Sequence, residues 1–262
     1  MSPVPPPFLP SSLPRAALVT GAARRIGRAV ALDLAKAGFA VAIHYSRSAA
    51  EAEAVAAEIV GRGGKAVALG ADLAREEEVV PLVARAVQAL GPLGVLVNNA
   101  STFERDDALG ATRGSWDLHM EVNLRAPFVL TQDFARQLPE TGEGVVVNLL
   151  DQRVWNLTPH FTTYTLSKAA LWTLTQTLAL ALAPRVRVVA IGPGPALPST
   201  RQSDAQFAAQ VAVLPLARAT SPAEVCRTIR FLLATPSVTG QMIALDGGQH
   251  LSWATGGQSP EE

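Results

Sequence analysis

Several features that mark other classes of protein are scarce in this 262-residue chain. Its single cysteine, Cys226, excludes an internal disulfide and favours a reducing compartment, so we expect a cytoplasmic protein. Acidic and basic residues number 22 each and no basic block occurs, which argues against nucleic-acid binding. No apolar run is long enough to span a membrane, and the four histidines lack the spacing of metal ligands. A small molecule is therefore the expected partner.

What the chain does have is a regular alternation of strand-like and helix-like segments. The expected strands are almost uniformly apolar and cover Ala16–Thr20, Val41–His44, Ala66–Leu69, Val95–Asn98, Val145–Leu150, Val186–Ile191 and Met242–Leu245. Helices are predicted from a glycine turn near Gly21 to about Ala37, and over Ala49–Gly61, Glu76–Leu90, Ser115–Leu138, Thr163–Leu182 and Pro222–Ala234. Apolar strands separated by helices are typical of a parallel sheet covered on both faces. We therefore predict an α/β fold with a single doubly wound, Rossmann-type domain, whose parallel seven-stranded sheet binds ligands at the carboxyl ends of its strands.

The two ends of the chain differ from this pattern. The first fourteen residues contain six prolines and no charge, and they lack the basic start and apolar stretch of a signal peptide. Proline at this density favours an extended chain. We predict a disordered or surface-lying tail over 1–14, the Rossmann-type domain over 15–251 and a second tail over 252–262.

The segment from Ala16 to Gly27, A-A-L-V-T-G-A-A-R-R-I-G, predicts a buried strand, a tight glycine turn and the start of a helix. Such a turn binds anions, because free backbone N–H groups and the helix dipole both face the ligand. Its place after the first strand of an alternating pattern is the context that a dinucleotide site requires.

The run Y164-T-L-S-K168 contains one of only two tyrosines and one of only three lysines. On a helix, this spacing puts both side chains on one face. An ammonium beside a phenol favours the phenolate and lowers a pKa that is ordinarily about 10. Tyr164 would then exchange a proton near neutral pH, and the alternative is a surface contact between neighbours one turn apart.

Together with N98-N99-A100, Asn123 and P193-G194, these motifs resemble the short-chain dehydrogenase/reductase family over almost the whole chain, from about Arg15 to Leu251. The resemblance implies that the N-N-A turn supports a nicotinamide cofactor. It also implies that Asn123 joins Tyr164 and Lys168 in a proton relay.

A first departure from the family pattern is Asp151, which stands thirteen residues before Tyr164 where the family usually has serine. A hydroxyl donates a hydrogen bond to a substrate carbonyl, whereas an ionised carboxylate only accepts and would repel a developing alkoxide. An aspartate suits a substrate that is protonated during the reaction, or an acid that itself supplies the proton. The alternative is an exposed loop acid at the end of the strand.

Two further departures agree with the first. Arg25 replaces the middle glycine of the turn, where its guanidinium would lie beside the pyrophosphate and reach the substrate. Phe103, after N98-N99-A100, would stack on an aromatic substrate, unless it is a loop side chain that covers the core. With Asp151 and the segment H44-Y-S-R47-S48, these residues resemble the pteridine reductase branch of the family. In that branch aspartate, tyrosine and lysine are catalytic, and the pterin lies between a phenylalanine and the nicotinamide.

The leading interpretation is NADPH-dependent reduction of a dihydropterin (dihydrobiopterin, dihydromonapterin or dihydrofolate) to the tetrahydro form. The alternatives are a carbonyl or 3-oxoacyl reductase and a non-catalytic NADPH-binding regulatory protein. We predict NADPH rather than NADH because the end of the second strand offers His44, Arg47 and hydroxyl groups to a phosphate and no carboxylate to repel it. His44 would border that phosphate, and Asp72 would contact the adenine. The segment from about Pro195 to Ala217, where the substrate loop is expected, has no motif that decides the pterin.

The predicted site follows from these motifs and the resemblance. The cofactor-binding residues are Gly21, Arg24, Arg25, Ile26, Gly27, His44, Tyr45, Arg47, Ser48, Asp72, Leu73, Asn99, Ala100, Ser101, Tyr164, Lys168, Pro193, Gly194 and Ala196. The substrate-binding residues are Arg25, Ser101, Phe103, Asp151 and Tyr164, and the catalytic residues are Asp151, Tyr164, Lys168 and Asn123. No metal site is predicted.

The resemblance also implies a homotetramer. The predicted helices Ser115–Leu138 and Thr163–Leu182 carry more apolar surface than one face of a sheet needs. Apolar residues around most of a helix indicate burial on a second side, which a symmetric partner would supply. The tail from Gln249, with Trp253, is expected to cross towards a neighbouring subunit.

Overall fold

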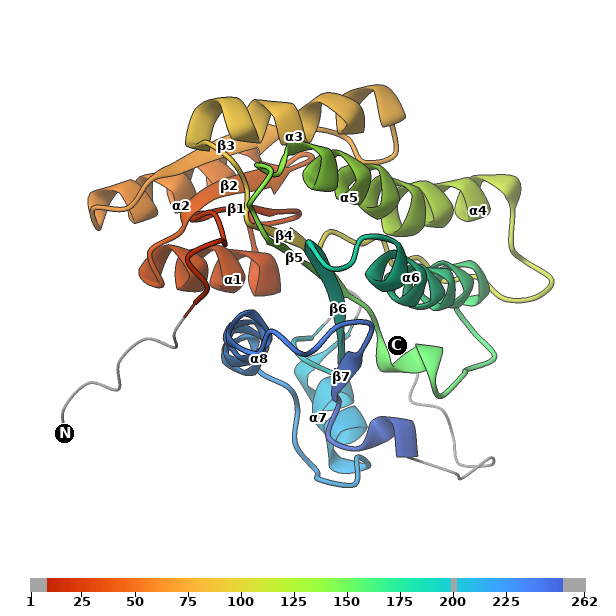
Figure 1. Ribbon diagram of the computed structural model, residues 1–262. Coiled ribbons are helices and arrows are strands. Elements are labelled where there is room, and N and C mark those ends of the chain that lie inside the picture. The colour runs from red at the N-terminus through yellow and green to blue at the C-terminus, as the bar shows by residue number, and fades with distance from the viewer. Residues whose placement is uncertain (1–8, 199–201, 252–262) are drawn as a thin grey trace, which may run out of the picture.

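The computed structural model describes residues 9–198 and 202–251. All seven strands pair in parallel in one sheet, in the order β3-β2-β1-β4-β5-β6-β7 (Figure 1). The strands are β1 (Ala16–Val19), β2 (Ala40–Tyr45), β3 (Ala66–Gly70), β4 (Val95–Asn98), β5 (Gly144–Leu149), β6 (Val186–Pro193) and β7 (Met242–Leu245). The predicted α/β fold and parallel seven-stranded sheet are confirmed. The strand order reverses between β1 and β4, and in such sheets this switch point is where ligands bind.

Helices cover both faces of the sheet (Figure 1). They are α1 (Arg25–Lys36), α2 (Ala49–Gly61), α3 (Glu76–Leu90), α4 (Arg113–Met120), α5 (Ala126–Gln137), α6 (Thr162–Ala181), α7 (Asp204–Ala212) and α8 (Pro222–Ala234). The core residues of α1, α2 and α8 lie on one face, and those of α3, α5 and α6 lie on the other. Among the described residues, no helix has both the length and the apolar character needed to cross a membrane.

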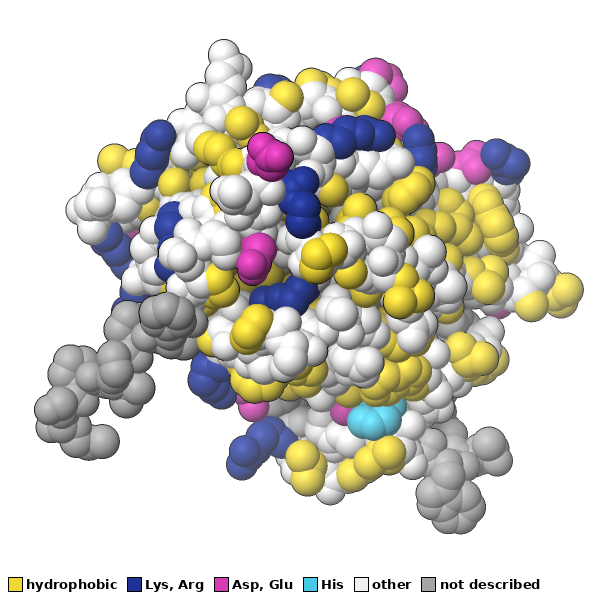
Figure 2. Space-filling view, in the orientation of Figure 1, with side chains coloured by type: hydrophobic (Ala, Val, Ile, Leu, Met, Phe, Trp, Pro, Cys, Tyr) yellow, Lys and Arg dark blue, Asp and Glu magenta, His cyan; other side chains and the backbone are white. Residues whose placement is uncertain are grey.

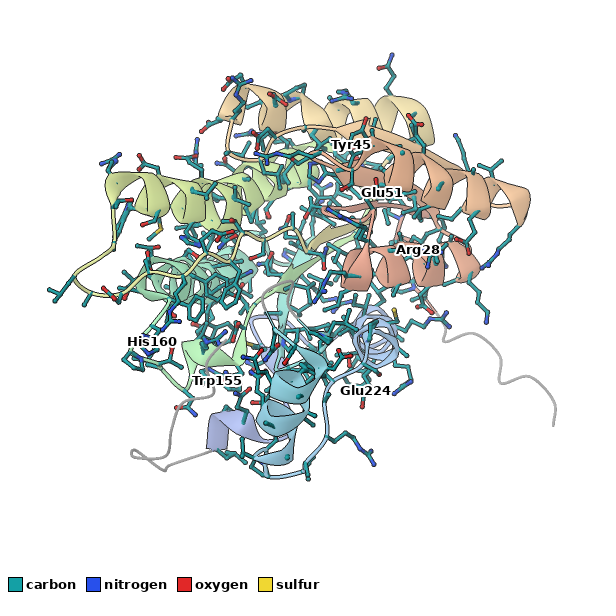
Figure 3. The ribbon with its side chains drawn as sticks, turned by 180° about the vertical axis from the view of Figure 1, so that it is seen from behind. Arg28, Tyr45, Glu51, Trp155, His160 and Glu224 are labelled. Atoms are coloured by element: carbon teal, nitrogen blue, oxygen red, sulfur yellow. The ribbon has the colours of Figure 1, made fainter. Side chains whose placement is uncertain are left out.

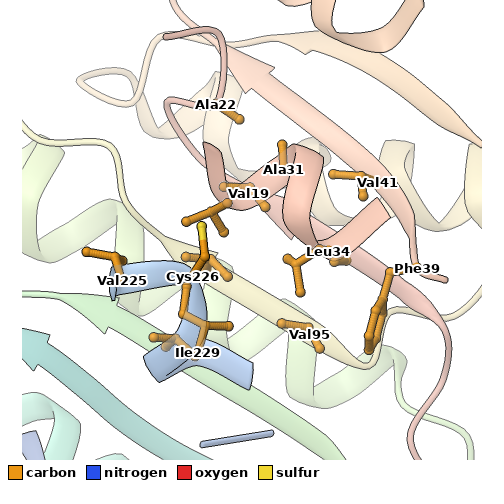
Figure 4. Close-up of a cluster of buried hydrophobic side chains, with 14 of the residues drawn as sticks. Val19, Ala22, Ala31, Leu34, Phe39, Val41, Val95, Val225, Cys226 and Ile229 are labelled. Carbon is orange, nitrogen blue, oxygen red and sulfur yellow. The ribbon is translucent and has the colours of Figure 1, made fainter. Parts of the chain in front are cut away.

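The strands divide their side chains between two cores, as the two-residue period of a strand requires. In β1, Ala17 and Val19 face the first core, whereas Ala16 and Leu18 face the second. Figure 4 shows part of the first core, where residues of β1, β2 and β4 meet α1 and α8, with Phe39 at one end. Strands buried on both faces explain why the strand segments of the sequence are almost uniformly apolar.

The predicted helix Ser115–Leu138 is present over Arg113–Gln137, but its middle turn is not α-helical. The chain forms α4, then a π-helical turn over Glu121–Arg125, and then α5. Pro127 lies in the first turn of α5 and has no backbone N–H, and its ring would collide with a carbonyl four residues earlier in a regular helix. A wider turn before the proline avoids that collision and places Asn123 at the bulge, a feature that often occurs at functional sites.

The ends of the chain are more ordered than predicted where they are described. Residues 9–14 pack against the body of the protein, with Leu13 buried in the first core and Ser12 accepting a backbone hydrogen bond from Glu143. Residues 1–8 of the predicted tail, and residues 252–262 with Trp253, lie outside the described residues. Helix α7 was not predicted, since its segment carries no clear apolar period, although Ser203 and Gln206 form a reciprocal cap at its start.

Candidate active site

Two adjoining cavities open at the carboxyl ends of the strands. The larger, of about 660 Å³, is lined by all the predicted cofactor residues from Gly21 to Ser101. The smaller, of about 240 Å³, is lined by the predicted residues Phe103, Asp151, Tyr164, Pro193, Gly194 and Ala196. Arg25 and Ile26 line both cavities and so join them. In Figure 3, Tyr45 marks the side of the larger cavity at β2.

The turn after β1 is shaped by glycine and held by the turn after β4. Gly21 has a φ of +61°, and a Cβ atom at Gly27 would lie 2.2 Å from the Gly21 carbonyl oxygen. The Asn99 side chain donates to the Thr20 carbonyl oxygen, and the Thr20 hydroxyl accepts from the backbone N–H groups of Asn99 and Ala100. No side chain caps the first turn of α1, so its N–H groups are available to an anion. This cradle fits the pyrophosphate of a dinucleotide.

Arg25 occupies a backbone position that favours glycine. Its φ is 53°, in the left-handed region where a side chain is strained. This strain explains why the family pattern has glycine there. The guanidinium donates to the carbonyl oxygens of Pro198 (2.8 Å) and Leu197 (3.2 Å). In the structure Arg25 thus holds the segment after β6 across the junction of the two cavities, whereas the sequence predicted ligand contacts for it.

His44 lines the larger cavity but is only 1% exposed. Its Nδ1 accepts the Gly21 N–H (3.0 Å), and its Nε2 lies 3.0 Å from the Ala71 carbonyl oxygen, to which it donates. Burial lowers the pKa of His44 to about 4, so the ring is neutral at physiological pH. The prediction that His44 borders a phosphate is therefore replaced by a structural role, in which it ties the glycine turn to the end of β3.

The cations expected at the end of β2 remain at the surface of the larger cavity. Arg47 is exposed there, and Arg24 is exposed with a long ion pair of 3.9 Å to Glu51. Figure 3 shows Glu51 on α2. Two exposed guanidinium groups beside a glycine turn suit a phosphate dianion.

Of the predicted catalytic side chains, Asp151 and Tyr164 line the smaller cavity, and Lys168 is buried behind them on the helix that carries Tyr164. The Tyr164 hydroxyl donates to Asp151 Oδ2 (2.8 Å). The buried Lys168 ammonium donates to the Leu149 carbonyl oxygen (2.8 Å) and lies 5.9 Å from the centre of the Tyr164 ring. Burial lowers the pKa of Lys168 to about 8, although the Asp151 carboxylate acts in the opposite direction. Lys168 is therefore charged at neutral pH and begins to lose its proton just above it.

The Asn123 side chain is fully engaged in holding the scaffold. Its carbonyl oxygen accepts from the Thr102 backbone N–H (2.9 Å) and the Ser101 hydroxyl (3.1 Å). Its amide nitrogen donates to the Thr102 carbonyl oxygen and to Ser167 on α6, 3.0 Å in each case. Asn123 thus joins the loop after β4 to the helix that carries Tyr164.

One group of side chains near Asp151 was missed by the sequence analysis: Phe161, Arg153, Gln152 and Gln210. The Phe103 ring stacks on Phe161 at a centroid distance of 4.3 Å and meets the Tyr164 ring edge-on at 4.6 Å. The Arg153 guanidinium lies 5.2 Å from the Phe103 ring centre and 5.3 Å from that of Phe161, and it bonds Asp151. The only signal for Arg153 was its place two residues after Asp151. Gln152 and Gln210, which also line the smaller cavity, had no signal at all.

A second missed group fixes the loop that carries Phe103. Asp106 accepts hydrogen bonds from the backbone N–H and the hydroxyl of Thr163, and so caps the start of α6 from a distant loop. The buried His119 accepts the Glu104 N–H at Nε2 (3.1 Å), and its Nδ1 lies 2.8 Å from the Thr163 hydroxyl. These bonds position Phe103 against the first turn of α6.

Known proteins are similar to this chain in sequence and fold. Residues 15–208 match the short chain dehydrogenase family. The NADP complex of FolM alternative dihydrofolate reductase 1 from Brucella canis is 50% identical, with a TM-score of 0.91 over 95% of this chain and all of that one. The Brucella suis counterpart, also with NADP, is 53% identical, with a TM-score of 0.89 over 92% of this chain and 96% of that one. A 3-oxoacyl-[acyl-carrier-protein] reductase from Synechocystis is 36% identical over 237 residues, which are 88% of this chain and 95% of that protein. The chain belongs to the short-chain dehydrogenase/reductase family, and the predicted resemblance is confirmed.

Replacing His44 by glutamine tests its structural role. The amide retains an acceptor for Gly21 and a donor for Ala71 but does not titrate. The folded-state pKa of His44 is lowered from 6.5 to about 4, so the unfolded chain takes up the proton first as the pH falls. The unmodified protein should lose up to about 3 kcal/mol of unfolding free energy from this residue between about pH 6.5 and 4. Urea unfolding at pH 7.5 and 4.5 should show a smaller loss in His44→Gln, and an equal loss in both proteins would contradict the assignment.

Proposed function

We propose that this short-chain dehydrogenase/reductase uses NADPH to reduce a 7,8-dihydropterin, such as dihydrobiopterin, dihydromonapterin or dihydrofolate, to the tetrahydro form. The observation that carries the proposal is the hydrogen bond of 2.8 Å from the Tyr164 hydroxyl to Asp151, at the position where the family usually has serine. The similarity to two Brucella proteins named alternative dihydrofolate reductases, at 50% and 53% identity, supports the same class of substrate.

The larger cavity supports NADPH as the cofactor. Its glycine turn offers the backbone N–H groups of α1 to the pyrophosphate, and Arg24 and Arg47 offer guanidinium groups to the phosphate on the adenosine ribose. Asp72 lines the far part of the same cavity, where the adenine would lie. Both Brucella structures contain NADP. When bound, NADPH supplies the hydride.

The residues of the smaller cavity suit protonation of a ring nitrogen. Reducing the N5=C6 bond of a 7,8-dihydropterin adds a hydride at C6 and a proton at N5. Tyr164 donates to Asp151 in the structure, so the pair holds one proton between a phenol and a carboxylate, and N5 takes that proton. The Lys168 ammonium would hold the nicotinamide ribose and would favour the phenolate that remains. Asn123 holds α6 and the loop after β4 in fixed positions relative to each other, through its bonds to Ser167 and Thr102.

The carboxylate also explains the choice of substrate. A nitrogen that gains a proton becomes more positive and is stabilised beside Asp151, whereas a carbonyl oxygen becomes negative when hydride adds to its carbon, and is repelled. Phe103 and Arg25, which line the same cavity, suit a flat heteroaromatic ring, with Phe103 stacking on it and Arg25 holding the segment above it. Ser101 lies at the entrance from the cofactor side.

Reduction of a carbonyl or 3-oxoacyl group is the second candidate. The similarity to the Synechocystis 3-oxoacyl-[acyl-carrier-protein] reductase, at 36% identity, favours it. The carboxylate at position 151 disfavours it for the electrostatic reason given above. A non-catalytic NADPH-binding protein is disfavoured because Asp151, Tyr164 and Lys168 retain a connected arrangement at the cavity.

Changing Asp151 to serine tests the proposed role of the carboxylate. Serine restores the usual family pattern, so the variant should lose about 100-fold in kcat with dihydrofolate. It should bind NADPH as before, because Asp151 does not line the larger cavity. Asp133→Ser on α5, outside both cavities, is the matched control. Full dihydrofolate reduction by Asp151→Ser would show that the carboxylate has no part in the reaction.

Changing Arg47 to alanine tests the cofactor. Loss of one charge-assisted hydrogen bond to the ribose phosphate should weaken NADPH binding about tenfold, and NADH binding should not change. The exposed Arg136 on α5, changed to alanine, controls for loss of surface charge. Fluorescence titration of both nucleotides measures the affinities. Unchanged NADPH affinity in Arg47→Ala, or equal turnover with NADH in the unmodified protein, would refute the assignment.

The apolar surface of α4 and α6 supports a homotetramer. These helices are in contact, and together they expose Trp116 (43%), Leu166 (44%) and Leu180 (84%). Figure 2 shows hydrophobic side chains gathered over this part of the molecule. Large apolar side chains grouped on one face are stabilised by burial against a symmetric partner.

Light scattering at micromolar concentration should give about four times the 27.5 kDa mass of the chain. Leu180→Glu should shift the protein to a smaller species, because a charge would then be buried at the interface. Val60→Glu changes an exposed valine on α2 and should leave the assembly intact. A monomeric unmodified protein would contradict the proposal.

A further inference from the structure

We propose that Arg153 is a positioning residue, which holds the Asp151 carboxylate on the Tyr164 hydroxyl and links it to the aromatic wall of the cavity. The inference deepens the proposed function, since it rests on the role given to Asp151. Arg153 acts on the rate through Asp151 and needs no contact with the cofactor.

Asp151 lies where the chain turns after β5. Asp151 caps the short 3-10 turn Gln152–Val154, with Oδ1 accepting the Arg153 backbone N–H at 2.9 Å. This bond fixes the plane of the carboxyl group. The other oxygen, Oδ2, therefore points towards Tyr164, whose hydroxyl donates to it.

The Arg153 guanidinium bonds the same carboxylate. Arg153 Nη1 lies 3.2 Å from Oδ2, the same oxygen that receives the Tyr164 hydroxyl. One residue thus bonds both carboxylate oxygens, Oδ1 through its backbone and Oδ2 through its side chain. A carboxylate held at both oxygens cannot rotate away from Tyr164 without losing one of these bonds.

The side chains of Arg153 and Asp151 are both largely buried. The Arg153 and Asp151 side chains are only 12% and 14% exposed. Removing one partner of such a pair leaves the other charge without compensation, so the pair is sensitive to substitution. The charged groups around Asp151 are Arg153 on its own turn and the Lys168 ammonium on α6.

The Arg153 guanidinium also connects Asp151 to Phe103, the ring proposed to stack on the substrate. The Arg153 guanidinium lies within 5.3 Å of the ring centres of both Phe103 and Phe161. A planar guanidinium is well suited to contact an aromatic face while its N–H groups bond a carboxylate, and an ammonium cannot do both equally well. Arg153 therefore fixes the proton donor and the aromatic wall relative to each other.

The test compares two variants. Arg153→Met keeps much of the side-chain volume but has no charge, and Arg153→Lys keeps the charge but lacks the planar guanidinium group. Each is made alone, and Arg153→Met is also combined with Asp151→Asn. Single-turnover oxidation of NADPH with dihydrofolate, with enzyme in excess, measures the rates, including low residual ones. Thermal unfolding of the protein without ligands is the second measurement, and NADPH titration is the third. Arg136→Met on α5 is the matched control.

We expect Arg153→Met to lose at least tenfold in rate with NADPH affinity within twofold, and Arg153→Lys to recover part of the loss. In the Asp151→Asn background, Arg153→Met should change the rate by less than twofold, because the group through which it acts is gone. The fall in unfolding temperature of the double variant should be smaller than the falls of the two single variants combined.

Independent effects of the two substitutions on the rate would overturn the inference, as would an unchanged rate or a loss of NADPH binding in Arg153→Met. Failure of the proposed function can be told apart from failure of the role proposed for Arg153. If the unmodified enzyme reduces only a 3-oxoacyl thioester, the same variants are measured on that thioester. The unfolding measurements need no substrate in either case.

Discussion

The site depends on the parallel pairing of β4, β5 and β6 and on the chain of buried amides that joins them to α6. The Asn98 side chain donates to Asn148 on the next strand, and Asn148 donates to Thr175 on α6. Because Asn98 and Asn148 are also paired in register, the segments after both strands begin at the same edge of the sheet. Asp151 and Tyr164 meet there, thirteen residues apart along the chain. The hydrogen bond between Tyr164 and Asp151 therefore depends on how the sheet places the end of β5 and how α6 packs beside it.

Much of this arrangement could be predicted from the sequence, because it rests on local patterns. Apolar runs mark strands buried on both faces, and the Tyr164/Lys168 spacing marks one face of a helix. Contacts that need the tertiary structure could not be predicted. His44 was expected at a phosphate, but burial and two backbone partners make it part of the scaffold. The pairing of Arg153 with Asp151 depends on neighbours that no local pattern encodes. The π-helical turn before Pro127 had a local signal in the proline itself, which the predicted uninterrupted helix did not take into account.

The proposed specificity follows from the sign of one charge. Serine at position 151 would offer a donor to an oxygen that becomes negative, whereas the carboxylate is an acceptor that favours a nitrogen gaining a proton. Arg153 balances the charge of Asp151 and shares Oδ2 with the Tyr164 hydroxyl, while its backbone N–H holds Oδ1. The cavity thus combines an oriented acid–phenol pair with a flat aromatic wall at Phe103.

The most direct test of this account is the ratio of kcat/KM values of the unmodified enzyme for 7,8-dihydrofolate or 7,8-dihydrobiopterin and for a 3-oxoacyl thioester, with NADPH in each assay. The oxidation of NADPH is followed together with the formation of the tetrahydro product. The account predicts that at least one dihydropterin is reduced with a higher kcat/KM than the thioester. Efficient reduction of the thioester, with no tetrahydropterin formed, would contradict it.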